Sequence, residues 1–270
     1  MEHTDMMRLV PLYSGSSGNA SVLEAGQVRV LIDAGKGLKL LREALALVDI
    51  PPESIDAVLI THEHADHIAA LGAWVRKYAT PVYANAATWE AMEPKLGRVP
   101  EGCIRIFESE RDFYLKGMNV LPFRTPHDAA ESVGYRFSYA GRTVTFMTDI
   151  GHMTERLLSA AEGSDLLLLE ANHDEEMLLA GDYRYDLKRR ILSDRGHLSN
   201  ENAGKTIAKL YPRGVRNVIL AHLSENNNYE QLALTTVESV LRMEQIPEGA
   251  VQLTVAHRNR PTGIFEIAAK

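Results

Sequence analysis

The sequence is poor in cysteine: Cys103 is the only one among 270 residues. A single cysteine excludes an intramolecular disulfide framework and a cysteine-based zinc finger, so any metal site must use histidine and carboxylate side chains. Long apolar runs are also missing, and the longest, around Leu166–Leu169, is far too short to span a bilayer. Met1–Met7 lacks the basic-then-apolar order of a signal peptide. These absences predict a cytoplasmic protein without a membrane partner.

Positive charge is in the minority, with 29 lysines and arginines against 36 aspartates and glutamates and a formal net charge of −7. This balance argues against a protein whose whole surface coats nucleic acid, but it leaves room for a local basic patch. The hydrophobic share of 45% and the charged share of 24% are ordinary for a globular protein. The length suits one large domain or two small ones.

Histidine is scarce, yet three of the ten histidines lie within the segment Thr61–His67, which reads THEHADH. The apolar run Ala57–Ile60 before it predicts a buried strand. The segment Ile68–Tyr78 after it has apolar residues close to a helical stripe. We therefore expect the cluster at a turn from a strand to a helix, where side chains can converge on one point.

Imidazole and carboxylate are common ligands of divalent transition metals. His62 and His64 are two residues apart and would point to the same side of an extended backbone. Asp66 and His67 lie where the chain turns and can face back toward that pair. Four ligands around two separated centres indicate two metal ions rather than one. The alternative is an exposed polar turn without a ligand role, which chance would rarely make so dense in histidine.

This pattern resembles the metallo-β-lactamase superfamily, and the resemblance extends along essentially the whole chain. It implies an α+β fold, the αββα four-layer sandwich, in which two mixed β-sheets pack face to face with helices on their outer faces. A faint symmetry of two halves, each with strands followed by helices, is typical of that fold. We therefore expect a single domain over residues 1–270, without a linker or a low-complexity segment.

The resemblance also implies the remaining metal ligands, each of which follows an apolar stretch. It implies two sets joined by a bridging carboxylate: His62, His64 and His127 on one metal; Asp66, His67 and His222 on the other; and Asp149 between them. Asp33 would support the metal-binding turn without ligating a metal, although taken alone it could equally cap a turn. Such a set accepts zinc or manganese, and iron is a further option.

A small polar loop, Ser14–Asn19, separates two expected strands. Glycines allow tight turns whose N–H groups can bind an anion, and serine and asparagine side chains add donors. The simpler interpretation is a hairpin turn. The stretch Ser14–Ala20, SGSSGNA, resembles a signature of the YycJ/WalJ-like branch of the superfamily. The phosphate-binding candidates in the loop are Ser14, Ser16, Ser17, Gly18 and Asn19.

Two later segments, Glu170–Asp174 and Gly196–Asn200, resemble paired motifs of ribonuclease Z in which a glutamate orients a histidine near the metals. Carried over, Glu170 would hold His197, and His197 would protonate the leaving oxygen or bind the phosphate. A carboxylate suits this role because it stabilises the charged imidazole. His173 is a second candidate for contact with substrate.

A basic run, Lys188, Arg189 and Arg190, lies between these two motifs, with Tyr183–Tyr185 before it and Arg195 beyond. Arginine suits phosphate recognition, and aromatic rings stack on unpaired bases. Such a run is more often a solvated helix face, but its position favours a local phosphate-binding surface. By contrast, we expect four other residues to be solvated: His152, His257, Arg258 and Arg260.

The branch that this chain resembles consists of proteins that look like 5′-to-3′ DNA exonucleases. The resemblance therefore implies a metal-dependent phosphodiesterase that acts on DNA with a 5′-phosphate end, with a hydroxide bridging two metals as nucleophile. Asp66 would also orient that hydroxide. One alternative is a hydrolase of a small thioester or lactone. The other, a non-enzymatic nucleic-acid-binding regulator, is disfavoured because every ligand position is filled. Native metal, strand preference and oligomeric state stay open.

Overall fold

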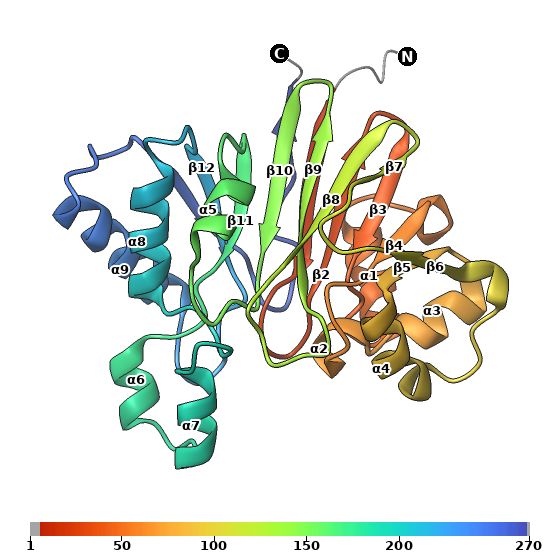
Figure 1. Ribbon diagram of the computed structural model, residues 1–270, viewed down its shortest axis with the longest axis horizontal. Helices are drawn as coiled ribbons and strands as arrows, with labels where there is room; N and C mark the ends of the chain where they lie inside the picture. The colour runs from red at the N-terminus through yellow and green to blue at the C-terminus, as the bar shows by residue number, and fades with distance from the viewer. Residues whose placement is uncertain (1–5, 269–270) are drawn as a thin grey trace.

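The computed structural model, which describes residues 6–268, contains two mixed β-sheets of seven strands each (Figure 1). The first sheet has, in spatial order, β14 (Phe265–Ile267), β1 (Met7–Tyr13), β2 (Ala20–Ala25), β3 (Val28–Ile32), β4 (Ala57–Leu59), β5 (Val82–Asn85) and β6 (Ile104–Phe107). The second has β13 (Gln252–Val255), β12 (Asn217–Ala221), β11 (Leu166–Glu170), β10 (Arg142–Met147), β9 (Val133–Tyr139), β8 (Met118–Arg124) and β7 (Phe113–Leu115). In each sheet one half is parallel, from β3 to β6 and from β10 to β13, and the other half is antiparallel.

Helices cover the outer faces of both sheets. They are α1 (Leu38–Leu47), α2 (Ala65–Ile68), α3 (Leu71–Tyr78), α4 (Ala86–Leu96), α5 (Glu155–Ala161), α6 (Glu175–Ala180), α7 (Tyr185–Ile191), α8 (Asn200–Leu210) and α9 (Glu230–Met243), with short 3₁₀ helices at Pro52–Ser54 and Glu101–Cys103. Helices α6 and α7 project beyond the sheets at the lower end of the view in Figure 1. None of the helices within residues 6–268 is long and apolar enough to cross a membrane. The cytoplasmic location stays a prediction.

Three apolar clusters account for the layers. One joins the first sheet to α1, α3 and α4, one lies between the two sheets, and one joins the second sheet to α5, α8 and α9. Neighbouring residues of one strand pack into different clusters, because successive side chains point to opposite faces of a sheet. Leu168 lies between the sheets, whereas Leu167 and Leu169 face the helices. The expected αββα sandwich is confirmed, and burial on both faces explains the continuous apolar run of β11.

The strand-to-helix turn expected around the histidine cluster is confirmed, since β4 ends at Leu59 and α2 begins at Ala65. The single helix expected over Ile68–Tyr78 is wrong in detail. It is divided into α2 and α3, because the N–H of Ala70 donates to the carbonyl of Ala34 (2.8 Å) instead of continuing the helix. That hydrogen bond ties the turn to the end of β3.

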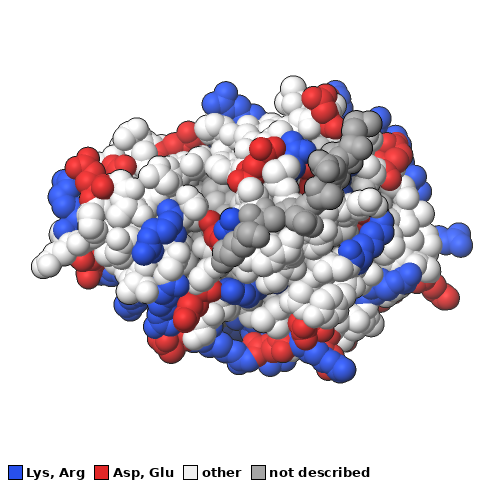
Figure 2. All heavy atoms as spheres, turned by 90° about the horizontal axis from the view of Figure 1, so that it is seen from above, with Lys and Arg blue, Asp and Glu red and all other residues white. Residues whose placement is uncertain are grey.

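Both termini lie at the end of the molecule opposite the histidine-bearing turn (Figure 1). Seen from that end, basic and acidic side chains of the described residues are interspersed over the surface (Figure 2). Such a mixed surface lacks the single sign of charge that a nucleic-acid-binding face requires. The residues expected to bind metal lie at the other end, where the parallel strands finish.

Candidate metal centre

The segment after β4 brings its side chains together through one tight turn. His64 precedes the first residue of α2, and its carbonyl accepts a hydrogen bond from the N–H of His67 (2.9 Å). This turn carries Asp66 and His67 back toward His62, so that the His62 and His67 rings lie 4.1 Å apart between centroids. His62 and His67 are fully buried.

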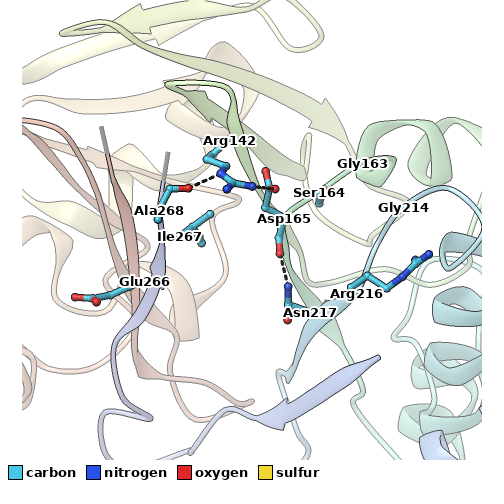
Figure 3. Close-up of a pocket in the computed structure, with 10 residues that line it drawn as sticks. All are labelled: Arg142, Gly163, Ser164, Asp165, Gly214, Arg216, Asn217, Glu266, Ile267 and Ala268. Atoms are coloured by element: carbon cyan, nitrogen blue, oxygen red, sulfur yellow. Dashed lines mark hydrogen bonds and ion pairs between the residues drawn. The ribbon is translucent and has the colours of Figure 1, made fainter. Parts of the chain in front are cut away.

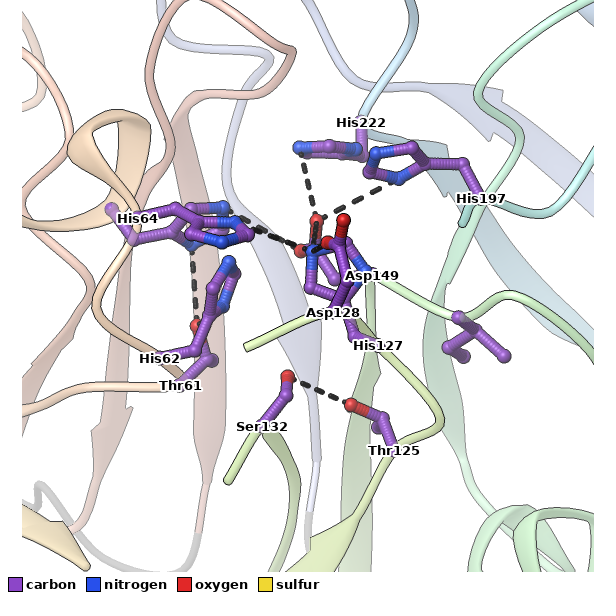
Figure 4. A network of polar contacts seen from close by, with 12 residues as sticks. Thr61, His62, His64, Thr125, His127, Asp128, Ser132, Asp149, His197 and His222 are labelled. Carbon is purple, nitrogen blue, oxygen red and sulfur yellow. Dashed lines mark hydrogen bonds and ion pairs between the residues drawn. The ribbon is translucent and has the colours of Figure 1, made fainter. Parts of the chain in front are cut away.

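The first group of candidate ligands joins His62 and His64 to His127, which follows β8. Nε2 of His127 lies 3.3 Å from Nδ1 of His64, and the His127 ring is 5.0 Å from the ring of His62. One ligand atom from each of the three residues lies within 4.8 Å of the others. Residues separated by more than sixty positions along the chain therefore converge on one point (Figure 4).

The second group consists of Asp66, His67 and His222, which follows β12. Nε2 of His67 lies 3.4 Å from Oδ2 of Asp66, and Nε2 of His222 lies 3.6 Å from the same oxygen. Asp149, directly beyond β10, lies between the groups. Its Oδ2 is 3.5 Å from Nε2 of His67, and its Oδ1 is 3.7 Å from Nε2 of His127 and 3.6 Å from Nε2 of His222, so the carboxylate lies beside both groups.

Four of the imidazoles have their Nδ1 engaged away from the centre, which leaves Nε2 facing it. The partners are Thr61 Oγ1 for His62 (3.1 Å), Asp33 Oδ2 for His67 (2.8 Å), the Gly196 carbonyl for His127 (3.1 Å) and Glu170 Oε1 for His222 (2.9 Å). A hydrogen bond at one ring nitrogen fixes the tautomer and aims the other nitrogen at a metal. The network thus presents a set of inward-facing lone pairs.

These donor atoms fit divalent metal ions. Nitrogen ligands at zinc–nitrogen distances of about 2.0–2.1 Å around a tetrahedral ion are separated by about 3.3 Å, close to the spacings found here. Moreover, His62 Nε2, His222 Nε2 and Asp149 Oδ2 are buried without a hydrogen-bond partner among the described residues. Buried polar atoms are rarely left without a partner. The residues present therefore suit a divalent metal site.

In the absence of a metal ion, protonated histidines balance the negative charge of the buried carboxylates. Burial alone would raise the pKa of Asp149, but protonated His222 and His67 hold it well below its usual value. Burial alone would lower the pKa of His222, but the nearby carboxylates of Asp149, Asp66 and Glu170 raise it to about 10. For His67, burial is likewise outweighed by Asp33 and Asp66, which raise the pKa well above normal. A bound cation would replace these protons, because metal ligands must be deprotonated.

Asp33 holds the ligand-bearing turn from behind. Its Oδ1 accepts from the N–H of Thr61 (2.9 Å), and its Oδ2 accepts from Thr61 Oγ1 (2.9 Å) and His67 Nδ1 (2.8 Å). The carboxylate is buried and points no free oxygen at the centre. This geometry agrees with a supporting role rather than a ligand role.

Three residues of the site have a left-handed backbone without being glycine: Asp33 (φ 59°), Asp149 (φ 59°) and His222 (φ 58°). Each lies within two residues of the carboxyl end of its strand, β3, β10 or β12. Such conformations cost on the order of 1–3 kcal/mol each and persist where the surrounding structure imposes them. The sharp turn directs each side chain across the edge of its sheet.

Glu170, the last residue of β11, is fully buried and accepts four hydrogen bonds. Oε1 accepts from Nδ1 of His197 (2.8 Å) and of His222 (2.9 Å). Oε2 accepts from the N–H groups of Ile150 (2.9 Å) and Leu198 (3.0 Å). Burial alone would raise the pKa of Glu170, but His197, by its charge and its hydrogen bond, and His222 lower it to about 2. Glu170 therefore orients a candidate ligand as well as His197, and only the second contact was expected.

The loop Ser14–Asn19 adjoins the second group of candidate ligands. Ser14 Oγ accepts a hydrogen bond from the N–H of His222 (2.8 Å). The Asn19 amide nitrogen lies 3.1 Å from Nε2 of His67 and 3.4 Å from Oδ2 of Asp66. Ser16 and Ser17 are exposed at the tip of the loop, whereas Gly18 is buried. Ser14 and Asn19 thus shape the site, and the two exposed hydroxyls are open to a ligand.

With this geometry established, comparison with known proteins decides the family. The family described as the β-lactamase superfamily domain matches residues 28–223. The chain belongs to the β-lactamase superfamily. Two relatives are Exodeoxyribonuclease WalJ of Streptococcus pneumoniae serotype 2, 39% identical over 88% of this chain and 89% of that protein, and Exodeoxyribonuclease YycJ of Bacillus anthracis, 38% identical over 85% of this chain and 87% of that protein. The resemblance to the YycJ/WalJ-like branch is thereby confirmed.

Ribonuclease Z of Mycobacterium bovis (strain BCG / Pasteur 1173P2) is a more distant relative, 34% identical over 30% of this chain and 31% of that protein. Among solved structures, the metallo-beta-lactamase fold protein YhfI from Bacillus subtilis has a TM-score of 0.73 at 18% identity. The match covers 98% of this chain and all of that one. At that identity the likeness concerns the fold alone.

The basic run Lys188–Arg190 was also predicted to contact substrate, and the structure shows the present partners of its side chains. The Lys188 ammonium donates to the carbonyls of Leu179 (2.7 Å) and Gly181 (2.6 Å), so it closes the end of α6 instead of facing an open surface. Arg190 pairs with Asp128, next to a candidate ligand, and Arg189 lies over the Tyr185 ring. Two of the three cations in the run already have anionic or carbonyl partners, and phosphate binding by the run stays a prediction.

His173 is buried, and both of its ring nitrogens lack a hydrogen-bond partner within residues 6–268. Burial lowers its pKa to about 4, against the raising effect of Glu170. Its contact with substrate stays a prediction.

Arg258 was expected to be solvated, and this prediction is wrong. The side chain is half-buried and donates to the Ser224 carbonyl (2.6 Å). Its position beside the Ser14–Asn19 loop explains the burial.

Two residues support ligand-bearing segments in a way that the sequence did not predict: Asn172 had no assigned role, and Arg195 was named only as an extension of the basic run. The Asn172 amide donates to the His222 carbonyl (2.8 Å), and the Arg195 guanidinium donates twice to the His127 carbonyl (3.0 and 2.8 Å). Each holds the backbone of a candidate ligand. Asn172 lies inside the Glu170–Asp174 motif, so its place in the sequence was the available signal.

A separate cavity of about 510 Å³ lies at the opposite end of the second sheet (Figure 3). It is lined where β10, β11 and β12 begin, by residues such as Arg142, Asp165 and Asn217. These groups interact with one another, as Arg142 pairs with Asp165 (2.7 Å) and Asn217 donates to the Asp165 carbonyl (3.0 Å). This cavity is therefore remote from Asp149, Glu170 and His222, which follow or end the same strands.

Proposed function

We propose that this protein is a metal-dependent exodeoxyribonuclease that removes nucleotides from the 5′ end of DNA. The observation that carries the proposal is its 39% identity, over most of both chains, to a protein named as an exodeoxyribonuclease. The geometry supports it, because the candidate ligands from both halves of the chain converge and the Glu170–His197 pair lies beside them.

The metal site that we propose holds two divalent cations. His62, His64 and His127 would hold one, Asp66, His67 and His222 the other, and Asp149 would serve both. Zinc and manganese suit this set, and iron is also compatible with it. Such a pair, when bound, supplies an activated water at neutral pH and offsets charge on the phosphodiester.

His197 is the candidate general acid. Glu170 accepts the proton of its Nδ1, so Nε2 is the atom that can carry a second proton to the leaving 3′-oxygen. The buried carboxylate stabilises the imidazolium before transfer. The His197 side chain is 19% exposed, in contrast to the fully buried His62 and His67, which leaves it accessible from the open side of the site.

The Ser14–Asn19 loop would hold the terminal 5′-phosphate. It is bonded to the backbone or side chains of His222, Asp66 and His67 and so lies directly next to the proposed metals. A phosphate held there would leave the next phosphodiester along the strand for cleavage. This arrangement accounts for attack from an end rather than within the strand.

The test uses purified protein loaded with Mn²⁺ or Zn²⁺ and DNA labelled at its 3′ end, with either a 5′-phosphate or a 5′-hydroxyl. We expect stepwise shortening from the 5′ end, faster with the phosphate, and none with Asp66→Ala. Exclusively internal cuts, or cleavage that is unchanged in Asp66→Ala, would contradict the proposal. Hydrolysis of small thioesters or lactones without DNA cleavage would identify the alternative hydrolase, and DNA binding without cleavage the regulator.

A further inference from the structure

Two basic side chains that the sequence did not indicate flank the exposed tip of the Ser14–Asn19 loop. Lys36, just beyond β3, donates from Nζ to Ser17 Oγ (2.9 Å). Arg258, just beyond β13, places its Nε beside Gly15, and this nitrogen is buried without a hydrogen-bond partner among the described residues. A buried guanidinium nitrogen with no acceptor indicates a site where an anion can bind.

The loop glycines allow both cations to approach. A Cβ at Gly15 would lie 3.3 Å from Cγ and Nε of Arg258, and a Cβ at Gly18 would lie 2.7 Å from Cδ of Lys36. Larger residues at these positions would push the two side chains away from the loop. The glycines therefore have a packing role in addition to any role in the turn.

Both cations are also fixed to segments that carry candidate ligands. Arg258 donates from Nη2 to the carbonyl of Ser224 (2.6 Å), two residues after His222. The N–H of Gly35, directly before Lys36, donates to the carbonyl of Asn19 (2.8 Å). The pair is thus anchored on either side of the loop.

The cations repel each other and have one acidic neighbour, Glu225. Burial and Arg258 lower the pKa of Lys36, whereas Glu225 raises it. Arg258 Nη1 lies 3.8 Å from Glu225 Oε1, but that carboxylate is 59% exposed, so solvent weakens the ion pair. A phosphate dianion would relieve the repulsion better than this loose contact, because it accepts from both cations at once.

We propose that Lys36 and Arg258, together with the Ser16 and Ser17 hydroxyls, bind the terminal phosphomonoester of a DNA strand. This inference rests on the proposed function and names the residues that set its preference for a phosphorylated end. Arginine contributes a fork of donors, and lysine a point charge, to the same phosphate. Both act on substrate binding, and neither is itself a candidate metal ligand.

The experiment compares wild type, Lys36→Gln and Arg258→Gln with Lys39→Gln as matched control, since the Lys39 side chain is 88% exposed and forms a loose ion pair with Glu43 (3.9 Å). Affinity for single-stranded DNA labelled at its 3′ end is measured by fluorescence anisotropy on metal-free protein, for 5′-phosphate and 5′-hydroxyl ends. Cleavage rates of both substrates are then measured with Mn²⁺. Circular dichroism and thermal unfolding check that each variant is folded.

We expect wild type and Lys39→Gln to bind the phosphorylated end more tightly. Lys36→Gln and Arg258→Gln should lose about tenfold of that preference, equivalent to about 1.4 kcal/mol, with unchanged binding of the 5′-hydroxyl strand. In cleavage the loss should appear in KM for the phosphorylated substrate. Equal weakening toward both ends, or an unchanged preference, would overturn the inference. A phosphate preference that depends on Lys36 without any cleavage would support the inference while contradicting the proposed nuclease.

Discussion

Replacing Glu170 by glutamine is the sharpest test of how the site is organised. The substitution keeps the size of the side chain but removes its charge and one acceptor oxygen. Oε1 now accepts from two imidazole N–H groups and Oε2 from two backbone N–H groups. In either orientation of the amide, its NH₂ group would face two donors. Two buried donors must therefore lose their acceptor.

Two routes give the same order of magnitude for the cost. Unsatisfied buried donors cost about 1–3 kcal/mol each. The pKa of Glu170 is lowered from 4.5 to about 2, so the folded protein favours the charged over the neutral carboxyl by about 3 kcal/mol. We therefore expect the free energy of unfolding of metal-free Glu170→Gln to fall by about 3 kcal/mol at pH 7, measured by urea denaturation.

The substitution should lower both metal affinity and kcat. Because Glu170 fixes the tautomer of His222, metal affinity measured by chelator competition should fall about 10–100-fold. Because it also stabilises charged His197, kcat at saturating metal should fall by about 10² or more. Glu175→Gln, an exposed change at the start of α6, is the matched control and should behave as wild type. Wild-type metal affinity and kcat in Glu170→Gln would refute the positioning role.

Three further predictions follow from the same geometry. Gly35→Ala should disrupt the ligand turn, because its Cβ would lie 1.6 Å from the Asp66 carbonyl oxygen; we expect lost metal binding by calorimetry, whereas Gly37→Ala, with nothing within 4 Å, should bind as wild type. Buried His173, with its pKa lowered from 6.5 to about 4, stays neutral in the folded chain while the unfolded chain takes up a proton. Its contribution is therefore present above pH 6.5 and is lost as the pH falls toward 4, by up to about 3 kcal/mol; denaturation of His173→Gln at several pH values should show a shallower slope, and an unchanged slope would contradict it. Adding Zn²⁺ at about 1,000 times its Kd should raise the free energy of unfolding of chelator-treated protein by about 4 kcal/mol, and Asp149→Ala should reduce this gain.

Much of the fold could be predicted because the sequence pattern is local. The apolar runs Ala57–Ile60 and Leu166–Leu169 largely coincide with β4 and β11, and the motifs follow them directly. Helix α9 was missed although Ala233, Val237 and Leu241 have helical spacing and are buried. The short helices α6 and α7 have only one buried residue each, Leu178 and Ile191, and so gave little periodic signal.

Some residues of the site could likewise be predicted from the sequence, and others could not. Chemically distinctive residues such as His62, with neighbours that contain two more histidines, could be named from the sequence alone. Arg258 could not, because its role depends on packing against Gly15, which lies more than two hundred residues earlier. Lys188 is a second case: its charge suggested a phosphate surface, but the sequence did not show that carbonyl groups at the end of α6 accept hydrogen bonds from its ammonium. Charge is visible in a sequence, whereas the partner that neutralises it comes from the tertiary structure.

Backbone hydrogen bonds join the Ser14–Asn19 loop to the turn that carries Asp66 and His67. These bonds determine which substitutions affect only one of the two segments. Asn19 N–H donates to the Asp66 carbonyl (2.8 Å), Gly35 N–H to the Asn19 carbonyl (2.8 Å), and Ala34 N–H to the His67 carbonyl (2.7 Å). Since backbone groups make these bonds, replacing Lys36 changes what the loop can bind without moving the ligands. Replacing Gly35 must change both, because its Cα lies against the backbone that joins them. End recognition and metal binding are therefore separable by side chain but not by backbone.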